Sequence, residues 1–132
     1  MNTKRIFLLL SFVFALDLLG ASKFAIPATD KGLPGEGPIR RYAWFKNLWE
    51  KNRTFLSNHF KHDQFSLFFL GDSITQGLGY NFLFHFKLLK VANRGISGDT
   101  TRGVLIRLKE DVLSLNPKGV WILIGTNDRE EK

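Results

Sequence analysis

The sequence predicts an α/β fold built on a parallel β-sheet. Short apolar runs alternate with helical patterns along the chain, which is the order that builds a parallel sheet with helices on its faces. Strands of such a sheet are buried on both faces, so their residues need not alternate between apolar and polar. Three runs have this character: Phe65 to Leu70, Leu88 to Asn93 and Val120 to Ile124.

The length and composition bound the kind of protein this is. With 132 residues and 15.1 kDa, the chain is the size of one small domain. Its 44% of hydrophobic residues, including thirteen Phe and three Trp, are enough to form a core and exclude disorder over most of the chain. The absence of Cys excludes a disulfide scaffold, a thiolate zinc site, a Cys nucleophile, an iron–sulfur cluster and a bacterial lipoprotein anchor.

The first 22 residues have the three-part pattern of a secretory signal peptide. Lys4 and Arg5 precede an apolar run of fourteen residues from Ile6 to Leu19, and small residues follow at 20–22. A helix needs about 20 apolar residues to span a bilayer, so the run is short for an anchor. We expect a secreted or periplasmic protein with no stable membrane anchor after cleavage; an uncleaved anchor or a core helix is the alternative.

Residues 23–40 are rich in Pro and Gly and are predicted to be a linker, with the folded domain covering 41–132. A surface helix is expected from Arg41 to Phe60, with charged side chains, including Arg53, away from the core. Its predicted core face consists of Tyr42, Phe45, Trp49, Leu56 and Phe60.

The chain has a formal net charge of +7. Seven basic and two acidic side chains lie between Lys31 and Lys61, a balance that favours anionic partners. The aromatic residues among them fit a core face, and no nucleic-acid motif accompanies them. We therefore expect no nucleic-acid partner.

A second helix is predicted from Thr101 to Leu115. Apolar residues recur there at helical spacing, and either Asp99 or Thr100 can cap its start. Asn116-Pro117 should end it, because the residue before proline avoids helical geometry.

Small and polar residues follow each predicted strand, at the edge of a parallel sheet where ligands bind. After the first strand, Gly71 permits a sharp turn, Asp72 can tie that turn down, and Ser73 would stand at the head of a helix as a nucleophile. The backbone N–H groups of Ser73 and Gly95 and the side-chain amide of Asn127 could together bind an oxyanion. The bland alternative is that the glycines only form turns and Asn127 only caps one.

These segments resemble three sequence blocks of the SGNH hydrolases, also called the GDSL esterase/lipase family. The blocks are Phe69 to Thr75, Asn93 to Thr101 and Gly125 to Asp128, in the family's order. The second block and the Leu-Asn-Pro-Lys stretch at 115–118 are most similar to the branch of the platelet-activating-factor acetylhydrolase catalytic subunits.

The resemblance implies a three-layer α/β/α flavodoxin-like parallel sheet and a serine esterase that hydrolyses a short acyl or acetyl ester. Ser73 would be the nucleophile, supported by Asp72, and Gly95 and Asn127 would complete the oxyanion hole. It implies a small-molecule or carbohydrate ester as substrate, with no metal and no cofactor.

The family's fourth block, Asp-x-x-His, does not occur in these 132 residues. His59, His62 and His85 lack its spacing, and none is expected to act as the general base. We therefore expect the N-terminal portion of a longer hydrolase, with its sheet truncated after the third strand and Val120 to Ile124 left as an apolar edge. Such a fragment should be inactive; the alternative is a non-catalytic ester- or carbohydrate-binding remnant of an SGNH hydrolase.

Overall fold

A computed structural model describes residues 22–79 and 84–129 of the chain. The predicted signal peptide lies almost entirely outside these residues, and no helix within them is long and apolar enough to cross a membrane. In chain order the elements are α2 (Ala43–Asn58), α3 (Phe60–Asp63), β1 (Leu67–Gly71), α4 (Ser73–Gln76), η1 (Phe84–Phe86), β2 (Val91–Gly95), α6 (Thr101–Asp111), η2 (Leu113–Leu115) and β3 (Gly119–Leu123).

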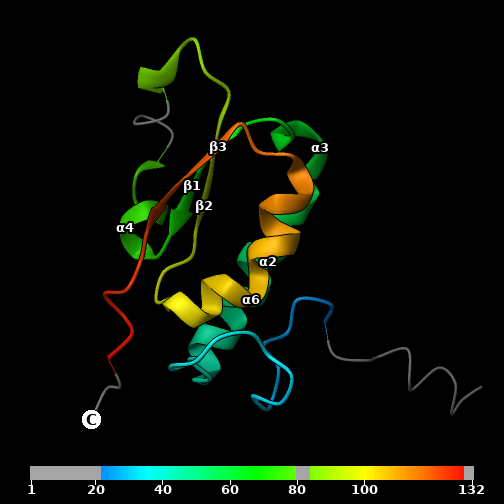
Figure 1. Cartoon of the computed structure of the whole chain (residues 1–132), viewed down its shortest axis with the longest axis vertical. Helices are drawn as coiled ribbons and strands as arrows, with labels where there is room; N and C mark the ends of the chain where they lie inside the picture. Colours follow the sequence, from blue (N-terminus) through cyan, green and yellow to red (C-terminus); the bar gives the residue numbers. More distant parts are fainter. Residues whose placement is uncertain (1–21, 80–83, 130–132) are drawn as a thin grey trace, which may run out of the picture.

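The three strands form one parallel sheet in the order β2-β1-β3, which confirms the predicted α/β class (Figure 1). Leu67 of β1 pairs with Val91 on one side and Gly119 on the other, and Gly71 pairs with Gly95 and Leu123. All three strands therefore end level with one another, and the segments that follow them emerge at a single edge of the sheet.

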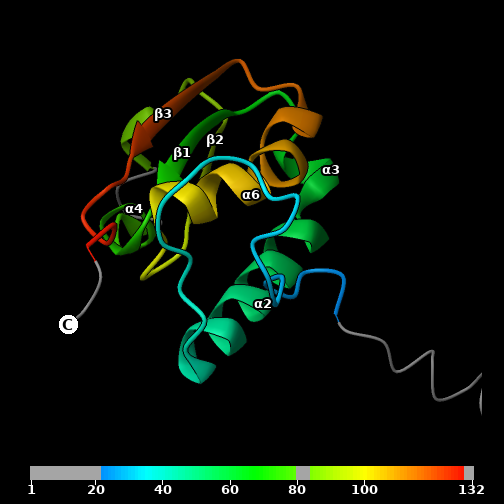
Figure 2. The same ribbon diagram turned by 60° about the horizontal axis from the view of Figure 1, so that its bottom comes forward.

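Successive residues of β1 face opposite sides of the sheet, and both sides are covered. Phe68 and Leu70 are buried in the main core, together with Ala92, Val104, Val112 and Leu115. On the opposite face, Phe69 packs against Phe86 of η1 and Trp121 of β3, with ring centroids 5.5 and 5.4 Å apart. Figure 2 shows α6 and α2 below the sheet. Helical segments therefore flank the sheet on both faces.

Two strands begin later than the sequence predicts, for local reasons. Phe65 has a left-handed φ of 61° and is exposed, so the extended backbone starts only at Leu67. Leu88 is 98% exposed in a turn that precedes β2, which starts at Val91. The sequence predicts strand at both positions because the residues are apolar, although neither side chain is buried.

Strand β3 forms one edge of the described sheet. Its inner edge pairs with β1, and no strand of residues 22–79 or 84–129 pairs with its outer edge. Trp121, Ile122 and Leu123 remain 47%, 54% and 38% exposed. The expectation that this strand is buried on both faces is therefore wrong for the described chain, whereas the expected unpaired apolar edge is present.

The predicted surface helix is divided into α2 and the short α3. Phe45, Trp49 and Leu56 are buried as predicted, while Tyr42 is 45% exposed. The sequence predicts an outward position for Arg53, and this prediction is wrong. Arg53 is buried, and its guanidinium donates to both carboxylate oxygens of Asp111 at 2.9 to 3.2 Å, which compensates for its charge.

Residues 22–40, here called the N-terminal strap, contain no helix or strand but pack closely on the domain. Ile26 is buried in a second core cluster with Phe45, Trp49 and Ile96. Arg102 of α6 donates to Asp30 at 2.5 Å and to the Gly37 carbonyl at 2.9 Å.

Helix α6 begins where the sequence predicts. Thr100 caps it, because its hydroxyl accepts a hydrogen bond from the Gly103 N–H at 3.0 Å. The same hydroxyl donates to the Pro38 carbonyl of the N-terminal strap at 2.8 Å. The helix ends at Asp111, earlier than predicted, and a 3-10 turn continues to Leu115, followed by Asn116 with a left-handed φ of 52°.

Candidate active site

Ser73 is exposed and is the first residue of α4, one residue after the buried strand β1 ends. Asp72, between them, is 1% exposed and accepts a hydrogen bond from the Ile74 N–H at 3.0 Å. This contact fixes the turn by which the chain leaves the sheet. The fixed turn therefore holds the Ser73 hydroxyl at the protein surface.

Two glycines paired across β1 and β2 let α4 lie directly on the sheet. A Cβ atom at Gly71 would collide with the Thr75 side chain and the Leu123 carbonyl. A Cβ atom at Gly95 would collide with the backbone of Gln76. The missing side chains therefore determine how deeply the helix that carries Ser73 is seated.

The end of β2 and the segment that follows it are hydrogen-bonded to α4. Asn93 donates from its side chain to the Thr75 carbonyl at 2.7 Å, and its side-chain oxygen accepts from the Gly95 N–H at 2.8 Å. The Ser97 N–H donates to the side-chain oxygen of Gln76 at 2.6 Å. The N–H of Gly95 is thus engaged within the end of β2, and its role in an oxyanion hole stays a prediction.

Asn127 reaches back from the segment after β3 to the other two segments. Its Nδ2 donates to the Asp99 carbonyl at 3.0 Å and lies 3.4 Å from Asp72 Oδ2. The next residue, Asp128, accepts from the N–H and the hydroxyl of Thr101 at the start of α6. The structure therefore brings Asn127 against the residue that precedes Ser73, and the role of Asn127 in an oxyanion hole stays a prediction.

Beneath this edge of the sheet lies an ion pair between Asp99 and Arg107, both completely buried. Arg107 Nε donates to Asp99 Oδ2 at 2.8 Å. Burial raises the pKa of Asp99 to about 6, and the attraction of Arg107 only partly opposes that rise.

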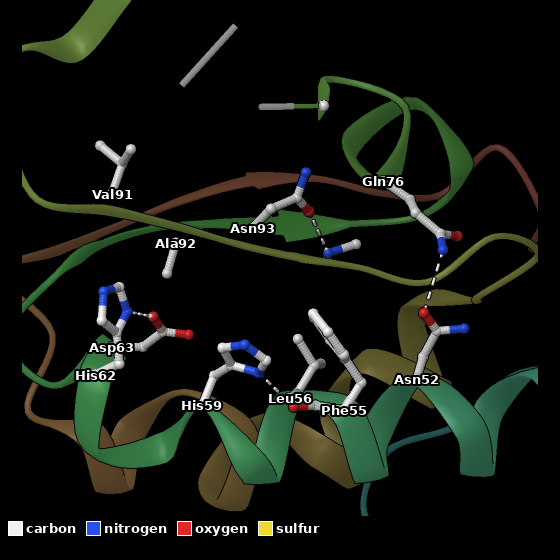
Figure 3. A pocket seen from close by; sticks show the side chains of 12 residues that line it. Asn52, Phe55, Leu56, His59, His62, Asp63, Gln76, Val91, Ala92 and Asn93 are labelled. Atoms are coloured by element: carbon white, nitrogen blue, oxygen red, sulfur yellow. Dashed lines mark hydrogen bonds and ion pairs between the residues drawn. The ribbon is translucent and has the colours of Figure 1, made fainter. Parts of the chain in front are cut away.

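The three histidines lie away from Ser73. His59 Nδ1 bonds to the Phe55 carbonyl, and His62 Nδ1 bonds to Asp63, each at 2.8 Å. Both line a cavity of about 370 Å³ between α2 and β2, shown in Figure 3. His85 lies in η1 and is exposed. Within the described ranges no histidine is hydrogen-bonded to Ser73.

Sequence reasoning missed three residues that organise this region: Gln76, Arg107 and Asp128. Gln76 and Asp128 lie within or beside the quoted motifs, so proximity to those motifs could have indicated them. Arg107 carries no such signal, because an arginine in an amphipathic helix ordinarily faces solvent.

Residues 69–131 match the model of the GDSL-like Lipase/Acylhydrolase family. This part of the chain belongs to that family. The matched residues of this GDSL-like segment include Asp72, Ser73 and Asn127, whose contacts are described above.

Curated proteins similar to this chain include an acetylxylan esterase and an acetylhydrolase subunit. The acetylxylan esterase of Geobacillus stearothermophilus is 48% identical over 40 residues, which is 30% of this chain and 18% of that protein. Platelet-activating factor acetylhydrolase IB subunit alpha2 of Homo sapiens is 42% identical over 65 residues, or 47% of this chain and 28% of that protein. The chain thus spans less than a third of the length of these relatives.

Proposed function

We propose that this chain supplies the nucleophile and oxyanion donors of a serine esterase acting on short acyl or acetyl esters. The observation that carries the proposal is the exposed Ser73 next to the contact between Asp72 and Asn127, within the GDSL-like segment. The acetylxylan esterase and the acetylhydrolase subunit that resemble the chain support the choice of an acyl or acetyl ester.

In the proposed reaction, Ser73 Oγ attacks the ester carbonyl carbon and gives its proton to a general base. The bond from that carbon to the alcohol oxygen breaks, and the alcohol leaves with a proton. Water then attacks the acyl-serine, which releases a carboxylic acid and restores Ser73. Asn127 would stabilise the oxyanion with the N–H that now makes its longer contact, to Asp72.

We expect turnover by these 132 residues to be slow. Ser73 has no histidine partner in the described ranges, and a hydroxyl without a base is a weak nucleophile. Oxyanion donors alone can still leave weak catalysis above the rate in water.

A test of the proposal combines covalent labelling with hydrolysis. The full chain would be treated with a fluorophosphonate and assayed with p-nitrophenyl acetate, beside Ser73→Ala, Asn127→Ala and the exposed-helix control Asn47→Ala. We expect labelling at Ser73, no labelling of Ser73→Ala, and a rate lowered about 10²- to 10³-fold in Asn127→Ala. Hydrolysis that is unchanged in Ser73→Ala would remove the serine from the mechanism.

The second candidate function is binding of an ester or carbohydrate without turnover. It is favoured by the engaged Gly95 N–H and by the Ser73 hydroxyl, which has no hydrogen-bond partner among the residues that the structure describes. If the chain stays unlabelled but binds acetylated sugars in calorimetry, this second function replaces the first.

We also propose that residues 1–22 direct export, on the basis of the charge and apolar pattern at the N-terminus. Expression of the full chain in a secreting host should yield an exported product that begins near residue 22 or 23. Protein that retains Met1 inside the cell would contradict this proposal.

A further inference from the structure

Arg107 of α6 contacts two of the three chain segments that meet at the candidate site, those that follow β1 and β2. Its Nη2 donates to the Arg94 carbonyl at 2.8 Å, at the end of β2, and to the Gly71 carbonyl at 3.3 Å, at the end of β1. Its Nε donates to the carboxylate of Asp99 at 2.8 Å. One guanidinium therefore joins the ends of two strands to the loop before α6.

The contacts continue from Arg107 to the residues of the site. The Asp99 carbonyl accepts the side-chain amide of Asn127 at 3.0 Å, and the same amide lies 3.4 Å from Asp72. The Gly71 carbonyl belongs to the residue immediately before Asp72. Arg107 is thus linked to the Ser73 turn in two ways. It bonds the Gly71 carbonyl at the start of the turn, and it is also connected to the turn through Asp99 and Asn127.

Only an arginine can make these contacts at once. Its rigid planar fork carries five N–H donors, whereas a lysine ammonium at the end of a flexible stem cannot occupy three separated acceptor positions in the same geometry. Arg107 is completely buried, so an acceptor that loses it gains no water in exchange. Any replacement should therefore let these segments move apart.

We propose that Arg107 is a positioning residue that holds Asn127 at the Ser73 turn by clamping Gly71, Arg94 and Asp99. The catalytic consequence of this inference rests on the proposed esterase function, whereas its structural part does not. Arg107 itself is buried and would not touch substrate.

The test compares Arg107→Lys with Arg53→Lys in the full chain. Arg53 of α2 is the control, because it is another buried arginine and its hydrogen bonds, to Asp111 and Glu110, do not reach the strand ends. Asp111 lies 3.5 Å from Arg107 Nη1 as well, so the control shares this one neighbour with Arg107. The primary readout is the NMR signal pair of the Asn127 side-chain amide, identified by its loss in Asn127→Ala. The Ile74 N–H signal, which reports the Asp72 contact, is followed in parallel.

In Arg107→Lys we expect the Asn127 amide signals to move toward those of the exposed Asn47, while in Arg53→Lys they stay at their wild-type positions. Fluorophosphonate labelling of Ser73 should slow by about ten- to a hundredfold in Arg107→Lys, because a displacement of about 1 Å can cost that much. Unchanged Asn127 and Ile74 signals in a folded Arg107→Lys, or equal changes in Arg53→Lys, would overturn the inference.

If Arg107→Lys does not fold, Asp99→Asn decides the question. This variant keeps an oxygen to accept the Thr100 N–H, at 2.9 Å in the wild type, but removes the charge that binds Arg107. The same displacement of the Asn127 signals is expected, and their constancy refutes the clamp. A wild-type chain whose Ser73 is never labelled refutes the esterase function alone, because the NMR readout needs no activity.

Discussion

The interior of this small domain contains many charged side chains. Four arginines and four aspartates are buried among the described residues, so buried positive and negative charges balance. Each arginine is held by carboxylates, because an unpaired buried charge would cost several kcal/mol. The arginines are Arg53, Arg94, Arg102 and Arg107, and the aspartates are Asp63, Asp72, Asp99 and Asp111.

Asp99 should give stability a dependence on pH. Burial raises the pKa of its carboxyl from 3.8 to about 6 in the folded chain, with Arg107 opposing and Asp111 reinforcing the rise. The folded state therefore binds this proton more tightly than the unfolded state. The contribution of protonated Asp99 to the free energy of unfolding is complete below about pH 3.8 and is lost as the pH rises through 6.

Urea unfolding of the wild type and of Asp99→Asn from pH 4 to 7 measures this effect. The free energy of unfolding of the wild type minus that of the variant should fall with rising pH, by up to about 3 kcal/mol. A difference that stays constant or grows with pH would contradict the raised pKa.

At the residue scale, motif chemistry predicted Asp72, Ser73 and Asn127 as members of one site, and the structure brings Asn127 to within 3.4 Å of Asp72. It could not predict Arg107, nor that Arg53 is buried. Burial of a charged side chain depends on whether a partner of opposite charge lies opposite it in the fold, and Asp111 is 58 residues away from Arg53. The helical spacing of residues around Arg53 does not show which distant residue will lie opposite it in the fold.

At the scale of elements, the close seat of the four-residue α4 on the sheet depends on Gly71 and Gly95. Gly95→Ala should lower the free energy of unfolding by about 1–3 kcal/mol, because its new methyl group meets the backbone of Gln76, which cannot rotate away. Gly77→Ala is the control, since its Cβ would lie 3.1 Å from the Ser73 carbonyl, a milder contact. Equal destabilisation by both variants would show that the seat of α4 is not the cause.

The exposed edge of β3 should make the chain self-associate. Trp121 and Ile122 combine an apolar surface with a strand edge that nothing in the described ranges pairs, which is a template for another strand. Light scattering should show aggregation that decreases in Ile122→Lys. The control Leu113→Lys removes an equally exposed apolar side chain from η2 and should have little effect; an equal decrease there would indicate general charge repulsion instead.

The apolar runs predicted the positions of all three strands, because buried strands are rich in apolar residues. They predicted starts for β1 and β2 that are too early. Phe65 and Leu88 are apolar residues of turns, and their exposure follows from the local backbone rather than from their type. The burial of β3 was overestimated for another reason. A strand is covered on both faces only where other elements pack on it, and the sequence of the strand does not report its neighbours.

At the scale of the whole molecule, the N-terminal strap joins the second core cluster to α6. Arg102→Ala should lower the free energy of unfolding by about 1–3 kcal/mol and speed amide exchange at 30–38, because Asp30 and the Gly37 carbonyl lose their shared partner. Arg41→Ala, which removes a more exposed contact to Asp30, is the control and should cost less. Exchange at 30–38 that is unchanged in Arg102→Ala would show that the strap is held by other contacts.

The N-terminal strap also determines where the chain can be joined to something else. Its first buried anchor is Ile26, and every polar contact that it makes with α6 comes from Asp30 or later. An affinity tag with a protease site placed before Ser22 would preserve these contacts, whereas a fusion that starts at Arg41 would remove residues 22–40 and all of their contacts. Removal of residues 1–22 in a cell would likewise keep the domain intact.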